Sequence, residues 1–125
     1  MSSPGNQIAT GVFTSTSGPA ATYINTGFMP KWVRTFQTGT AAMNTEWTED
    51  MPDATALKRI NEGVSAGIAS AITATGITPW RVDNHPANGA LTDQYGNVIK
   101  AGMRGFTIGV SCQTASLVTR WVALG

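Results

Sequence analysis

Residues 31–37, with the sequence KWVRTFQ, decide the fold class. Successive side chains of an extended chain point to opposite faces, so Trp32, Arg34 and Phe36 share one face and the residues between them share the other. Aromatic and β-branched residues favour strands, and Gly39 ends the run. The stretch therefore predicts a strand whose Trp32 and Phe36 side chains anchor a core.

Similar alternating runs recur along the chain, separated by glycine, proline, asparagine and aspartate, as is typical of sandwiches and barrels. They predict seven further strands, at residues 7–14, 21–26, 43–48, 77–82, 97–101, 104–111 and 116–123. The last two are predicted to form a hairpin, with Phe106 and Trp121 as further core anchors.

Residues 54–76 fit two interpretations. Their apolar residues lie three or four apart, which is typical of an amphipathic helix. Gly63 and Gly67, however, each cost about 1 kcal/mol inside a helix, and β-branched residues crowd the end of the segment. We therefore predict two strands here, at 56–60 and 68–75.

Size and composition predict one all-β domain with a polar but weakly charged surface. The chain has 125 residues, of which 42% are hydrophobic and only 12% are charged, against about 25% charged in typical domains. We expect a single-domain antiparallel β-sandwich, jelly-roll-like in topology. The net charge of +1 offers no basic field for direct nucleic-acid binding and little repulsion against self-association.

The opening 30 residues contain no Asp, Glu, Lys or Arg. We predict that residues 1–20 form a partly extended N-terminal arm with the first strand, and that residues 21–125 form the sandwich. Such an arm suits strand addition to a neighbouring sheet edge, where backbone hydrogen bonds supply affinity without charge. The apolar interface residues of the arm are Ile8, Val12 and Phe13.

Several short motifs are spread over most of the chain. They are GF-x-P-x-x-V within residues 23–33, Trp47 with Met51, Gly76 with Ile77, GFTIG at 105–109, and Trp121. Together they resemble small virion proteins of tailed bacteriophages, the capsid decoration or cement proteins. The resemblance implies a β-sandwich that binds the major capsid protein on the outside of the virion shell, usually as a trimer or other small homo-oligomer. Tail and fibre proteins carry similar markers, which leaves the position on the virion open.

One stretch of the sequence matches a catalytic motif. Residues 63–67 match G-x-S-x-G, and Asp83 and His85 follow in the order found in hydrolases. The motif needs a strand, turn and helix in a large α/β sheet, and an orienting aspartate two residues from its histidine is poorly placed to reach the ring. We therefore predict no catalytic residue and no enzyme.

No metal or cofactor site is predicted. Cys112 is the only cysteine and His85 the only histidine, so a zinc site lacks ligands. The densest acidic run consists of Glu46, Glu49, Asp50 and Asp53. Its oxygens suit Ca²⁺, but the spacing matches no EF-hand loop, and a polar rim facing basic residues such as Lys58 or Arg59 is the preferred interpretation.

The four tryptophans also admit two interpretations. Trp32, Trp47, Trp80 and Trp121 either anchor the core or a subunit contact, which we prefer, or stack on sugars. Two functions follow: a structural capsid protein, favoured by the uncharged opening, or a carbohydrate- or receptor-binding module of a tail or fibre. The sequence shows no run of 18 apolar residues and no secretory signal, so neither a membrane span nor export is predicted, and assembly is expected in a host cytoplasm.

Overall fold

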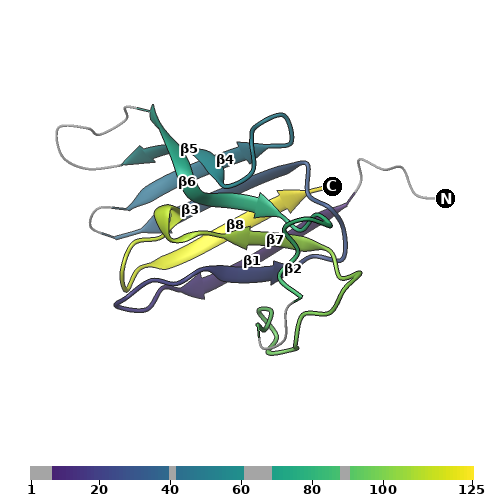
Figure 1. The fold of residues 1–125 in the computed structure, drawn as a ribbon. Helices are drawn as coiled ribbons and strands as arrows, with labels where there is room; N and C mark the ends of the chain where they lie inside the picture. Colours follow the sequence, from purple (N-terminus) through teal and green to yellow (C-terminus); the bar gives the residue numbers. More distant parts are fainter. Residues whose placement is uncertain (1–6, 40–41, 61–68, 88–90) are drawn as a thin grey trace.

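The computed structural model describes residues 7–39, 42–60, 69–87 and 91–125. Its elements (Figure 1) are β1 Ile8–Thr14, β2 Thr22–Asn25, β3 Trp32–Thr38, β4 Met43–Thr48, β5 Thr55–Ile60, β6 Ala69–Pro79, β7 Gly105–Ile108, the 3-10 turn η1 Val110–Cys112, and β8 Val118–Leu124. None of the described residues lies in a helix long and apolar enough to cross a membrane. The prediction of an all-β fold is confirmed.

The strands form one antiparallel sheet in the order β1-β8-β3-β4-β5-β6-β7-β2, which curls into a half-barrel (Figure 1). The two ends of the sheet thereby face each other as layers. The ring of Phe106 in β7 meets the ring of Trp121 in β8 edge-on across the interior, with centroids 5.4 Å apart. The predicted antiparallel single-domain fold is thus built from one continuous sheet.

β6 turns the corner between the two layers. β5 pairs with β6 up to Ile72 and again only at Ile77. Residues 73–76 bulge from the ladder between these points, with Thr75 at a φ of 54°. The backbone of Gly76 lies so close to β5 that a side chain would not fit there. Beyond the bulge β6 pairs with β7, so one bent strand serves both layers.

The two strands predicted within residues 54–76 are confirmed as β5 and β6, apart from residues 61–68, which lie outside the described residues. The strand predicted separately at 77–82 is instead the second half of β6, which ends at Pro79. The reason is that the bulge bends the strand without ending it.

The strand predicted at residues 97–101 is wrong. The side chain of Asp93 accepts hydrogen bonds from the backbone N–H groups of Tyr95 and Asn97, at 2.9 and 3.0 Å. These bonds close a turn, and the only strand-like pairing in this described segment is one isolated bridge between Thr92 and Val98. A side chain therefore takes the donors that a strand would have used.

The predicted hairpin of residues 104–111 and 116–123 is also wrong. β7 pairs with β6 and β2, whereas β8 pairs with β3 and β1. The turn η1 separates the two strands and carries the chain from one layer to the other, closed by a 3.1 Å bond from the Cys112 N–H to the Gly109 carbonyl. Phe106 and Trp121 are both buried, but in opposite layers.

β3 has the opposite orientation from the predicted one. Val33 and the two alternate residues after it are buried, whereas Phe36 is exposed, Trp32 is half-buried and Arg34 between them is exposed. Trp32 and Phe36 are therefore wrong as core anchors. Their face of β3 points away from the interior.

A buried polar network explains this orientation. The hydroxyl groups of Thr35 and Thr45 hydrogen-bond to each other between β3 and β4. The Gln37 amide donates to the Cys112 carbonyl at 3.2 Å, and its oxygen accepts from the Met43 backbone N–H at 3.1 Å. Buried polar groups are tolerated when they are hydrogen-bonded, so the polar side of β3 can face inward.

The strand predicted at residues 7–14 is confirmed as β1, but the segment predicted as an N-terminal arm is an edge strand of this chain's own sheet. β1 pairs with β8 along its whole length, and Phe13 packs against the core. The arm prediction is wrong for this segment because its inner side covers part of the interior, while residues 1–6 lie outside the described residues. Of the predicted interface residues, Ile8 and Val12 point outward and Phe13 does not.

The Cys112 thiol is completely buried beneath β3 and β4. Burial raises its pKa from 9.0 to about 11, against smaller opposing effects from a hydrogen bond with Thr45 and the charge of Lys58. The unfolded chain therefore loses this proton first, so the thiol's contribution to stability is complete below about pH 9 and is lost as the pH rises toward 11.

We expect the free energy of unfolding to fall more steeply between pH 9 and 11 in the wild-type protein than in a Cys112→Ala variant. Urea denaturation at several pH values measures both curves. The variant removes only this titration, and parallel curves would contradict the assignment.

Candidate docking surface

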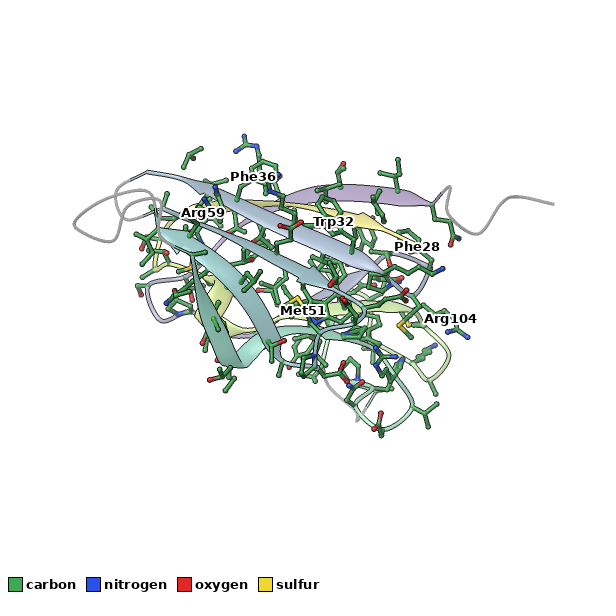
Figure 2. All side chains as sticks on the ribbon, turned by 90° about the horizontal axis from the view of Figure 1, so that it is seen from above. Phe28, Trp32, Phe36, Met51, Arg59 and Arg104 are labelled. Atoms are coloured by element: carbon green, nitrogen blue, oxygen red, sulfur yellow. The ribbon has the colours of Figure 1, made fainter. Side chains whose placement is uncertain are left out.

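The outward surface of β1, β8, β3, β4 and β5 forms one continuous face. Residues paired across antiparallel strands point to the same side, so the strand register assigns them to it. We call this surface the outer face; its main residues are Ile8, Val12, Arg120, Trp32, Arg34, Phe36, Glu46, Leu57 and Arg59. Figure 2 shows Phe36 on the side of the sheet away from Met51, which packs against the core.

Large apolar side chains are exposed on the outer face. The exposed fractions are 66% for Ile8, 59% for Val12, 50% for Leu57 and 37% for Phe36. The half-buried ring of Trp32 lies on the same face. Apolar groups gathered on one side of a small domain mark a surface that binds another molecule. The outer face is therefore the candidate docking surface.

Positive charge accompanies these apolar groups. Arg34, Arg59 and Arg120 stand on the outer face, and Glu46 is the only acidic residue of its five strands. The Glu46 carboxylate accepts a hydrogen bond from the Trp32 indole N–H at 2.6 Å. The guanidinium groups of Arg34 and Arg120 suit a partner whose apolar surface carries carboxylates.

Two shallow hollows lie in the outer face. One, of about 280 Å³, is lined in part by Arg34 and Leu57. The other, of about 330 Å³, is lined in part by Val12, Phe36 and Arg120. Each combines an apolar wall with a guanidinium group, so each suits a partner side chain with a carboxylate beside it.

His85, the candidate base of the hydrolase-like motif, holds two loops together. Its Nδ1 accepts a hydrogen bond from the Ala87 backbone N–H at 3.1 Å, so in the neutral ring Nε2 carries the proton and donates to the Met103 carbonyl at 2.7 Å. The ring also packs against Trp80, with centroids 5.6 Å apart. Both nitrogens are occupied by backbone groups, while residues 63–67 of the motif lie outside the described residues.

Three residues of the acidic run, Glu46, Asp50 and Asp53, bind separate partners. Glu46 bonds to Trp32, Asp50 to the hydroxyl of Thr48, and Asp53 to Arg81 at 3.3 Å and to Asn84 at 2.7 Å. Across the described ranges, no three potential metal-ligating side chains come together. Arg81 is a basic partner of this run that sequence reasoning did not single out.

Three of the four tryptophans are buried, namely Trp47, Trp80 and Trp121. Trp32 alone reaches the outer face. A pair of exposed tryptophans for sugar stacking is therefore not formed within the described residues, and Trp32 shares its face with Phe36 instead.

Sequence reasoning missed Leu57 and Arg120 as docking residues. One signal in the sequence could have identified this face. Arg34 lies between Trp32 and Phe36, and an arginine is rarely found on a fully buried strand face, so all three residues could have been expected to point outward. Leu57 and Arg120 join this face only through the strand register, which the sequence pattern did not give.

The glycines and tryptophans that carry the resemblance to virion proteins serve the fold. Gly27 has a φ of 79°, which favours glycine in the turn before β3. Gly105 and Gly109 lie against the backbone of neighbouring strands. Trp47 and Trp121 fill the core. These glycines and tryptophans therefore shape the fold that presents the outer face, whereas Trp32, which falls within the first motif, lies on that face. Comparison of the chain with protein-family models, with curated proteins and with solved structures returns no match.

Proposed function

We propose that this chain is a structural protein of a bacteriophage virion, a decoration or cement protein that binds the exterior of the shell through its outer face. One observation carries the proposal: β3 buries threonine and glutamine and turns Trp32 and Phe36 outward. A strand that faces water on one side ordinarily does the reverse. Such a surface is stable when a partner covers it, which is the situation of a protein that works inside an assembly.

The partner that fits is a surface of the major capsid protein that is apolar and carries carboxylates. Its apolar side chains would cover Leu57 and Phe36, and its carboxylates would pair with Arg34 and Arg120. Contacts of these kinds bind without any reacting group. The resemblance of the fold-forming motifs supports placing the partner on a phage shell.

A second candidate is a carbohydrate-binding module of a tail or fibre. The observation that favours it is the pair of aromatic rings on β3, because Trp32 and Phe36 stand about 13 Å apart along one face of the strand. Rings at this distance could stack on two sugars of one chain.

Immunogold electron microscopy separates the two candidates. Particles are purified from cells carrying the genome that encodes the chain, and are labelled with antibody raised against the folded protein. Label over the whole shell exterior supports the proposal, and label confined to the tail or fibres supports the alternative. Particles without label would overturn both.

Reversal of two outer-face charges is expected to weaken shell binding. The Arg34→Glu/Arg120→Glu variant should bind shells assembled without this chain at least about tenfold more weakly, because it repels the partner's carboxylates. The matched control is Lys100→Glu/Arg104→Glu, which makes the same charge change at exposed positions outside the outer face. Cosedimentation with the shells measures both, and equal loss in the two variants would contradict a specific role of the outer face.

A further inference from the structure

The two edges of the sheet, β1 and β2 (Figure 1), differ in how their backbone groups are satisfied. Just before β1, the Gln7 carbonyl accepts from the Gly125 N–H, and just after it the Ser15 N–H donates to the Leu117 carbonyl. Hydrogen-bonded pairs alternate along an antiparallel ladder, so the odd-numbered residues of β1 bond to β8. The N–H and C=O groups of the even-numbered residues point to the open edge.

The open edge of β1 is accessible. Its even-numbered residues are Ile8, Thr10, Val12 and Thr14, and all are exposed. No described residue hydrogen-bonds to their backbone groups on the open side. The strand also lacks the features that guard edges, because it contains no charged residue and no proline.

The edge of β2, in contrast, is capped by a side chain. The Asn25 N–H donates to Gln94 Oε1 at 2.6 Å, and Gln94 Nε2 donates to the Asn25 carbonyl at 2.8 Å. The Gln94 amide thus takes both backbone groups that a further strand would use at this position. Of the two ends of the sheet, only β1 therefore offers a long open edge among the described residues.

We propose that β1 pairs with β1 of a second copy of this chain, antiparallel and centred on Gly11. In this register Ile8 lies opposite Thr14 of the second copy and Thr10 lies opposite Val12, and the same pairs recur across the two-fold axis. Every outward-pointing backbone group of the strand then has a partner, with two hydrogen bonds per residue pair.

The chemistry of β1 favours its own copy as the occupant. In a two-fold contact a charged residue of β1 would lie near the same residue of the second copy, and the two like charges would repel each other. β1 contains no charged residue, so this repulsion is absent. Gly11 places no side chain at the axis. The pairing also joins the outer faces of the two copies, with Ile8 and Val12 along the line where the two β1 strands meet. The inference does not depend on the proposed function, and it gives a dimer in place of the trimer that the resemblance implies.

The register can be tested by a charge pair. In the Val12→Glu variant the new carboxylate lies opposite Arg120 within its own sheet, so the fold is kept, but it meets its duplicate diagonally across the two-fold axis. The dimer dissociation constant should rise about tenfold. Adding Thr10→Lys places opposite charges directly across the axis and should restore dimerisation. Val82→Glu, at an exposed loop position, is the matched control and should dimerise like the wild type.

Sedimentation equilibrium of the full chain at micromolar concentration measures each variant, and circular dichroism checks that each is folded. The expected wild-type mass is about 26 kDa, twice the 13.1 kDa of one chain. A wild-type monomer or trimer would overturn the proposal, as would a Val12→Glu variant that dimerises like the wild type. A double variant that stays monomeric would overturn the register centred on Gly11. If Val12→Glu does not fold, Thr10→Lys alone should weaken the dimer in the same way.

Discussion

Replacement of Trp121 by alanine is expected to lower the free energy of unfolding by about 3–5 kcal/mol. The indole is buried, meets Phe106 edge-on, and lies so close to Gly11 that no side chain would fit between them. Its loss would leave a cavity where the two layers meet. Because small domains are stable by only about 5–15 kcal/mol, the substitution should remove a large share of the total stability.

The matched control for this change is Trp32→Ala. It removes the same side chain from the outer face, where burial is only partial, so the loss should be clearly smaller. Guanidinium denaturation followed by circular dichroism measures both. Equal effects of the two substitutions would show that Trp121 is not a core residue.

Gly105→Ala is expected to disrupt the pairing of β7 with β2 and to lower the free energy of unfolding by more than about 3 kcal/mol. An added methyl group would lie far inside van der Waals contact of the Ile24 carbonyl oxygen, which belongs to the backbone of β2. Neither strand can move away easily, because Phe106 and Ile24 are both completely buried next to this point.

The same substitution at Gly18 provides the control. No atom lies within 4 Å of the position that its methyl group would take, and its backbone needs no positive φ. Gly18→Ala should therefore leave the melting temperature nearly unchanged. A Gly105→Ala variant as stable as Gly18→Ala would show that β2 and β7 are not packed as closely as described.

The alternation of side chains predicted most of the strands but not which side of each strand is buried. In β3 the larger apolar side chains lie outside, because the interior at this point is filled by hydrogen-bonded threonine and glutamine. Trp32 and Phe36 have larger apolar side chains than Val33 and Thr35, so any rule based on apolar size selects the wrong face. The network that reverses the preference joins β3 to β4 and to η1, which are brought together only by the fold.

The sequence pattern of each strand also did not predict which strands pair with each other. β7 and β8 are neighbours in sequence with a short connection, which favours a hairpin. The connection instead crosses the interior, because β8 finds partners in β1 and β3 on the other layer. The docking surface follows from these long-range pairings, and for this reason the sequence indicated Ile8 and Val12 but not Arg120 or Leu57.

The Gln94 amide on the edge of β2 limits association through sheet edges, in the way that the number of reactive ends limits the growth of a polymer. A monomer with two reactive ends grows into chains, whereas a monomer with one reactive end stops at the dimer. At one end of this sheet the Gln94 amide takes both outward backbone groups of Asn25, so under the proposed pairing of β1 the sheet has one reactive end. Under this pairing, a protein with a net charge of only +1 and many strands is expected to stop at the dimer at high concentration and not to grow into filaments.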